Sequence, residues 1–167
     1  MYRAAKPYDV LLDVARKLDR WVIDQNVAAR AEGLVTFRPC TIRVLGQAAL
    51  LEAGLSLQLA ATHDVDVIAD YDDAVRVEFA RLLAAEGREL DPVGAEAWMP
   101  RETRYTLLFS GKFVKLLLAE PEAVLVSKAL KAPSKNRPLL TEYLARTPSA
   151  RFWELAKRYA LNVEQFA

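Results

Sequence analysis

The feature that most constrains the fold of this chain is a short alternating segment, Asp64-Val65-Asp66-Val67-Ile68. Valine and isoleucine favour β-strands, and successive side chains of a strand point to opposite faces of the sheet. The spacing therefore predicts that Asp64 and Asp66 share one face, while Val65 and Val67 share the other. Two neighbouring carboxylates repel each other unless a cation or a proton lies between them. The segment is compatible with a site for a divalent cation, or with the solvent-facing side of a half-buried strand.

The residues just upstream add a second element to this pattern. Thr41 to Leu45 has the composition of a short strand, Gly46-Gln47 predicts a turn, and an alanine- and leucine-rich helix is predicted to begin at Ala48. A helix that begins after a glycine turn presents unpaired backbone N–H groups and the positive end of its dipole. The order of strand, turn, helix and acidic strand therefore predicts an anion site beside a cation site.

The rest of the chain predicts an α/β fold with a helical C-terminus. Apolar residues at helical spacing, with Gly or Pro at the boundaries, predict helices at 8–30, 74–85, 121–131, 138–145 and 149–161. Two apolar strands at 104–109 and 113–119 are predicted to form a hairpin, and residues 90–100 are predicted to be irregular. We expect one domain over 1–167, with an N-terminal helix in 1–33, a sheet core in 34–119 and C-terminal helices in 120–167.

Composition excludes several classes of protein. With 53% hydrophobic and 27% charged residues, the chain is neither disordered nor a membrane span. Its net charge of +1 gives no global nucleic-acid-binding footprint. Cys40 is the only cysteine, so the chain cannot form an internal disulfide. We therefore expect a cytoplasmic protein with no membrane association.

The ordered set of motifs resembles the nucleotidyltransferase superfamily, and more narrowly the small bacterial members related to the abortive-infection toxin nucleotidyltransferases. In that group a strand ends in Gly-Gly or Gly-Ser, a short helix follows, and a Thr-x-Asp-hydrophobic-Asp-hydrophobic strand comes next. Gly46-Gln47 and the segment from Thr62 to Val67 correspond to these motifs. Pro121-Glu122, followed by Lys128, is similar to the family's Pro-Glu pair before a lysine-bearing helix. The resemblance extends over roughly residues 41 to 130.

This resemblance implies a short mixed sheet flanked by helices, with a helical C-terminal tail. It implies that Asp64 and Asp66 bind Mg²⁺ or Mn²⁺ and are catalytic, and that Lys128 neutralises developing charge. Nucleotide-binding residues would be Gly46, Gln47, Thr62 and His63. The implied reaction is Mg²⁺-dependent transfer of a nucleotide from a nucleoside triphosphate to an RNA end, a protein hydroxyl or a small molecule. A toxin–antitoxin role and a homodimer are further expectations.

Two departures from the family pattern support an alternative. Gln47 stands where Gly or Ser is more usual, and the segment from Lys135 to Leu140 contains no acidic residue where the family has one. A third carboxylate has to come from one of five acidic residues, Glu89, Asp91, Glu96, Glu102 or Glu120. The alternative is a non-catalytic nucleotide-binding or assembly module on a degenerate nucleotidyltransferase fold, since a fold does not determine a function.

The three tryptophans have different expected environments. Trp21 and Trp153 have the spacing of buried helix faces, whereas Trp98 lies in the irregular segment beside Met99 and Pro100. An aromatic ring in such a segment is suited either to packing or to stacking against a nucleobase.

Overall fold

The computed structural model of the chain describes residues 7–53, 64–91 and 98–167, and it shows an α/β fold built around a five-stranded mixed sheet. The strands are β1 (Cys40–Leu45), β2 (Asp64–Ala69), β3 (Glu89–Leu90), β4 (Tyr105–Ser110) and β5 (Val114–Ala119). Their order across the sheet is β3-β2-β1-β5-β4. β1 runs antiparallel to β2 and parallel to β5, β2 is parallel to β3, and β4 is antiparallel to β5. The predicted α/β class and mixed sheet are confirmed.

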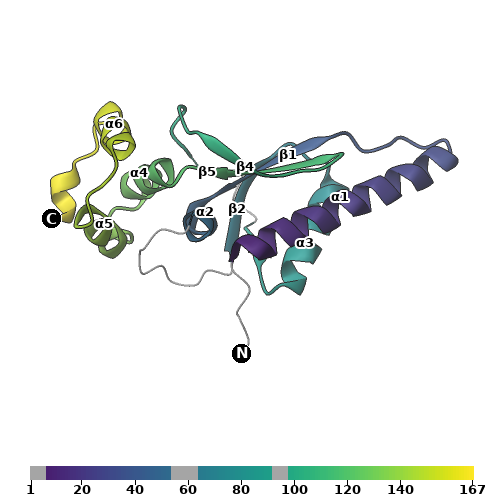
Figure 1. Cartoon of the computed structure of the whole chain (residues 1–167), viewed down its shortest axis with the longest axis horizontal. Helices are drawn as coiled ribbons and strands as arrows, with labels where there is room; N and C mark the ends of the chain where they lie inside the picture. The colour runs from purple at the N-terminus through teal and green to yellow at the C-terminus, as the bar shows by residue number, and fades with distance from the viewer. Residues whose placement is uncertain (1–6, 54–63, 92–97) are drawn as a thin grey trace.

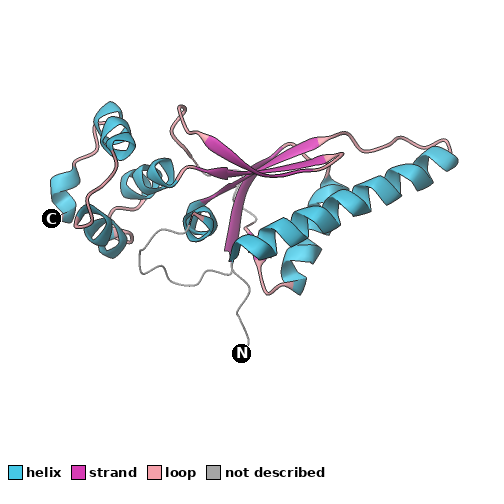
Figure 2. Cartoon of the chain, viewed as in Figure 1, coloured by secondary structure: helices cyan, strands magenta, loops and turns pink. Residues whose placement is uncertain are grey.

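Three helices lie on one side of this sheet, as Figures 1 and 2 show: α1 (Pro7–Ala31), α2 (Gly46–Glu52) and α3 (Asp73–Ala85). The strand residues that face them are fully buried, among them Ile42, Val44 and Val65. The alternation predicted for β2 is confirmed, because Val65 and Val67 are buried while Asp64 is exposed and Asp66 is half-buried. The aspartates therefore lie on the face opposite the main helical layer.

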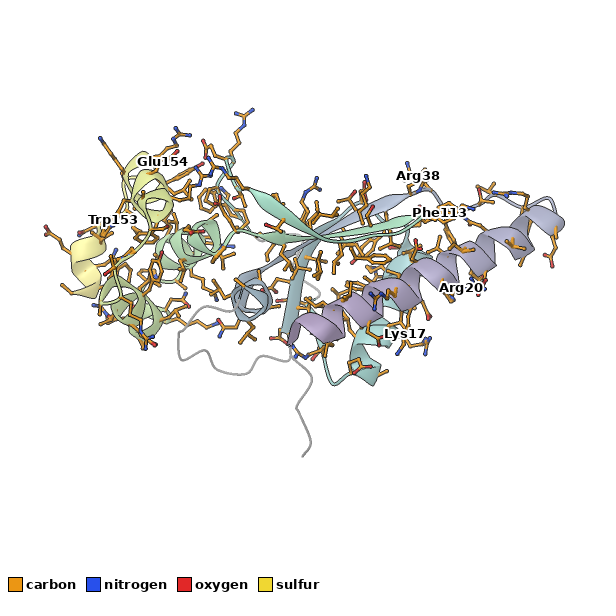
Figure 3. The ribbon with its side chains drawn as sticks, in the orientation of Figure 1. Lys17, Arg20, Arg38, Phe113, Trp153 and Glu154 are labelled. Carbon is orange, nitrogen blue, oxygen red and sulfur yellow. The ribbon has the colours of Figure 1, made fainter. Side chains whose placement is uncertain are left out.

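A buried aspartate of α1 joins that helix to the β4–β5 hairpin. Asp19 is only 8% exposed, and its carboxylate accepts hydrogen bonds from the backbone N–H groups of Lys112 (3.2 Å), Phe113 (2.8 Å) and Val114 (3.0 Å). A Cβ atom at Gly111 would overlap this carboxylate, which explains the glycine at the turn. In Figure 3 Phe113 lies over α1, and Lys17 and Arg20 of that helix point to solvent.

The C-terminal part is helical, as predicted, and forms the end of the molecule away from α1 (Figure 1). It contains α4 (Pro121–Lys131), α5 (Arg137–Leu144), α6 (Ala150–Arg158) and a 3₁₀ helix, η2 (Val163–Phe166). Pro121 occupies the first turn of α4. At the start of α6, the Ser149 hydroxyl accepts a hydrogen bond from the Phe152 N–H (3.2 Å). A largely buried ion pair, between Arg151 and Glu120 (2.9 Å), ties α6 to the residue before α4.

The structure corrects several local predictions. α6 ends at Arg158 rather than at residue 161, and η2 was not predicted. α3 begins at Asp73, one residue before the predicted start at 74, and Asp72 precedes its first turn. β3 lies in a region where no strand was predicted, because two residues are too short to produce a periodic pattern. Trp153 is 44% exposed rather than buried, and it points outward from α6 in Figure 3.

None of the helices in the described part of the chain combines the length and the apolarity that crossing a membrane requires.

Candidate active site

Gly46 and Asp66 are in direct contact, although twenty positions separate them in the chain. The register of β1 with β2 places Leu45 opposite Asp66, so that Gly46 follows at the end of β1 beside the aspartate. Gly46 has a positive φ of 62°, a conformation that L-residues avoid. A Cβ atom built on Gly46 would overlap Oδ2 of Asp66. The glycine is therefore required both by its backbone conformation and by the carboxylate against it.

Replacing Gly46 with alanine is expected to lower the free energy of unfolding by about 2 kcal/mol or more, from left-handed strain together with displacement of Asp66. Gly87→Ala is the matched control, because Gly87 has a similar φ of 71° but nothing within 4 Å of its added Cβ. Urea denaturation of both variants measures the difference. Equal losses of stability would show that the contact between Gly46 and Asp66 contributes nothing.

A second carboxylate, that of Asp91, lies beside Asp66. β2 and β3 pair in parallel, with Val65 opposite Leu90, and the Asp91 N–H donates to the Val65 carbonyl (3.0 Å). The Asp66 and Asp91 side chains share a hydrogen bond. Two carboxyl groups can form such a bond only if one of them carries a proton. Among the described candidate acids, Asp91 is the one whose side chain contacts Asp66, and Glu89 lies opposite Asp64. Glu96 lies outside the described residues.

The electrostatics of this pair favour a positive charge. Burial, above all, raises the pKa of Asp66 to about 6, from an ordinary value of 3.8. The hydrogen bond with Asp91, its charge and that of Asp64 raise the pKa further, and Lys128 opposes them. At neutral pH the site therefore carries poorly compensated negative charge, which a divalent cation would neutralise.

Asp66 lines a cleft of ≈ 180 Å³ between the end of β1 and α4. Segments far apart in sequence form its walls: the β1–α2 junction, β2, residues 98–99, α4 and the turn that follows α4. Its lining residues are Leu45, Gly46, Asp66, Trp98, Met99, Val124, Ser127, Lys128, Lys131 and Asn136. Three residues that the sequence singled out, Gly46, Asp66 and Lys128, are therefore brought to one cleft.

Lys128 is the half-buried cation of this cleft. The residues around it on α4, from Ala123 to Ser127 and Ala129, are buried. Burial lowers the pKa of Lys128, the charge of Asp66 raises it, and Lys135 lowers it. An ammonium group held close to a carboxylate in a partly desolvated cleft is well placed to meet an anionic ligand.

Other predicted site residues lie elsewhere. Asp64 is exposed at the first position of β2 and is not among the residues that line the cleft. The reason is strand geometry, because two residues advance a strand by about 7 Å. Gln47 is half-buried in the first turn of α2 and does not line the cleft either. Thr62 and His63 lie outside the described residues.

Asn136 lies where the family pattern has an acidic residue, and its side-chain amide has a structural role instead. Its side-chain Nδ2 donates to the carbonyls of Lys128 (3.1 Å) and Ala132 (3.0 Å) at the end of α4. Each of these carbonyls also accepts a backbone N–H, from Ala132 (3.1 Å) and from Asn136 (3.0 Å), so the amide adds a second hydrogen bond to both at the C-terminal end of α4. Asn136 thereby holds the helix end that carries Lys128, a role that its sequence position alone did not reveal.

The raised pKa of Asp66 predicts a pH dependence of stability. Because this pKa is higher in the folded than in the unfolded protein, protonated Asp66 favours folding fully below about pH 4, and this contribution is lost as the pH rises through about 6. Asp66→Asn removes the loss. The variant is therefore expected to gain about 1 kcal/mol over wild type between about pH 4 and pH 7, a figure reduced for solvent screening. Denaturant titrations without metal at both pH values measure this gain, and a pH-independent difference would contradict it.

Among the described residues, no group of three or more His, Cys, Asp or Glu side chains is arranged to hold a metal ion. Any cation at the Asp66–Asp91 pair would therefore complete its shell with water or with oxygen atoms of a ligand, as Mg²⁺ commonly does. Comparisons of the chain with protein-family models, with curated proteins and with solved structures found no match.

Proposed function

We propose that the protein is a Mg²⁺-dependent nucleotidyltransferase, which transfers a nucleotide from a nucleoside triphosphate to an acceptor. One observation carries the proposal: Gly46, Asp66 and Lys128, from three different elements, border one cleft, and Asp91 adds a second carboxylate beside Asp66. The resemblance of the sequence motifs to the nucleotidyltransferase superfamily supports it. Phosphoryl-type chemistry depends mainly on positioning and electrostatics, and this cleft offers both.

The Asp66–Asp91 pair fits a hard divalent cation. Its oxygen atoms are the ligands that Mg²⁺ and Mn²⁺ prefer, and the raised pKa of Asp66 marks a place where positive charge is favoured. A cation bound there would neutralise negative charge on a triphosphate and orient its phosphates. Asp64, on the same face of β2, lies further out and would contribute at most through water.

The triphosphate would lie against the cationic wall of the cleft. Lys128 and Lys131 both line it, together with Asp66 of β2. Lys128 would stabilise the charge that develops as the bond to the leaving pyrophosphate lengthens. Gly46 has no side chain, so the Asp66 carboxylate can lie directly against the β1–α2 turn at the edge of the cleft. With only seven residues, α2 adds little through its dipole.

A second candidate function is nucleotide binding without transfer. Asn136 favours it, because its amide is committed to the end of α4 and no acidic residue replaces it in the segment that follows. Such a protein would use the same cleft as a binding or assembly module.

Two parallel measurements separate these functions. Wild-type protein is incubated with each of four α-³²P-labelled nucleoside triphosphates and Mg²⁺ or Mn²⁺, with total RNA, with the protein itself as acceptor, and with a small-molecule extract. Binding of non-hydrolysable triphosphates is measured by calorimetry under the same conditions. Metal-dependent labelling supports the transferase, and binding without labelling supports the binding module. Failure of both contradicts the proposed site.

A further inference from the structure

We infer that Trp98 forms the nucleobase subsite of this cleft, with the base stacked on its indole ring. The inference rests on the proposed function and names how the same site would recognise the non-phosphate part of its ligand. A nucleotide has a charged tail and a flat, largely apolar ring, and the cleft has a wall suited to each.

The two walls differ in chemistry. Lys128 and Lys131 provide positive charge for phosphates, and Asp66 provides the carboxylate for a cation. Trp98 and Met99 form an aromatic and apolar part of the same cleft. Trp98 lines the cleft and is 41% exposed, so part of its side chain remains accessible. Every nucleobase has a π-face, and stacking on a tryptophan is among the commonest ways to bind one.

Contacts with neighbouring elements hold the indole ring in place. It packs edge-on against Tyr159, with ring centroids 5.4 Å apart and an angle of 80° between the planes. The backbone carbonyl of Trp98 accepts a hydrogen bond from the Ser127 hydroxyl (2.6 Å), and Ser127 precedes Lys128 on α4. Trp98 is therefore anchored to the helix that carries the cleft's lysine. A ring fixed before binding loses little entropy when a ligand stacks on it.

A polar network continues this support into the C-terminal helices. The Tyr159 hydroxyl donates to the Glu102 carboxylate and accepts from the Arg101 N–H (3.0 Å). Arg151 of α6 donates to the Glu102 carbonyl (2.8 Å), and it also pairs with Glu120. The segment that begins at Trp98 is thus bound to α4 and to α6. The C-terminal tail would in this way position the base subsite.

The experiment compares two ligands that share phosphates but differ in the base. Calorimetry measures binding of a non-hydrolysable Mg²⁺–nucleoside triphosphate and of Mg²⁺–tripolyphosphate to full-length wild type, Trp98→Ala and Trp98→Phe. Trp153→Ala is the matched control, because Trp153 is equally exposed (44%) but does not line the cleft. Trp98→Ala is expected to weaken nucleotide binding about 10-fold and to leave tripolyphosphate binding unchanged. Trp98→Phe should retain most of the nucleotide affinity, and Trp153→Ala should change neither ligand.

Fluorescence gives an independent readout that a purely structural role of Trp98 would not produce. In a Trp21→Phe/Trp153→Phe variant, Trp98 is the single tryptophan. Its emission should be quenched by the nucleotide and not by tripolyphosphate. Equal weakening of both ligands by Trp98→Ala, or an unchanged nucleotide affinity, would overturn the base subsite. If wild type binds neither ligand, the proposed function fails first and the subsite fails with it.

Discussion

Replacing Asp66 with asparagine is expected to lower the rate of nucleotide transfer about 1,000-fold or more while the protein stays folded. Asparagine keeps the shape of the side chain but removes the negative charge that would bind a cation beside Asp91. It also removes repulsion within the acidic pair, so the free energy of unfolding should not fall. The measurement is the initial rate of acceptor labelling by an α-labelled triphosphate, alongside a denaturant titration of each protein.

Asp24→Asn is the control for this prediction, because Asp24 is an exposed aspartate on α1 that pairs with Arg20 (3.5 Å). It should label at the wild-type rate. Asp91→Asn should resemble Asp66→Asn, because the two side chains interact, and Asp64→Asn should have a smaller effect, since Asp64 is exposed at the first position of β2. Undiminished labelling by Asp66→Asn would remove this residue from the chemistry.

Replacing Asp19 with alanine is expected to cost the most stability of any change considered, about 3–5 kcal/mol. The carboxylate accepts from three backbone N–H groups at the start of β5, and alanine leaves them without this acceptor. The β4–β5 hairpin would then lose its attachment to α1. Thermal and urea denaturation measure the loss.

Asp13→Ala is the matched control on the same helix. Asp13 is half exposed and pairs with Lys17 at 2.9 Å, so its removal should change the free energy of unfolding by less than about 1 kcal/mol. A similar small effect for Asp19→Ala would mean that solvent can replace the carboxylate at the hairpin.

Much of the fold follows from local sequence signals. Pro121 and Gly33 lie at real helix boundaries, and β1, β2 and the β4–β5 hairpin lie where alternation and turn residues predict them. Interactions between distant residues were not predictable in the same way. Nothing in the sequence of α1 indicates that Asp19 binds the hairpin, because a helical aspartate usually faces solvent. Trp153 has the spacing of a core residue and is nevertheless exposed.

The candidate site shows the same limit. The contact between Gly46 and Asp66 follows from the order of strand, turn, helix and acidic strand. The sequence motifs therefore already indicate that these two residues lie close together. The choice of Asp91 among the described candidate acids depends on the register of the two-residue strand β3, which no periodic pattern reveals. Asn136 and Trp98 reach the cleft only through the packing of α4, α6 and the segment before β4.

The central claim is that the Asp66–Asp91 pair holds a divalent cation against a nucleoside triphosphate. Locating the metal tests this claim most directly. Crystals grown with Mn²⁺ and a non-hydrolysable triphosphate would be measured at the manganese absorption edge. We expect one anomalous peak between the carboxylates of Asp66 and Asp91, with the triphosphate bound beside it and facing Lys128. A metal and nucleotide bound at another place, with the two carboxylates still hydrogen-bonded to each other, would contradict the account.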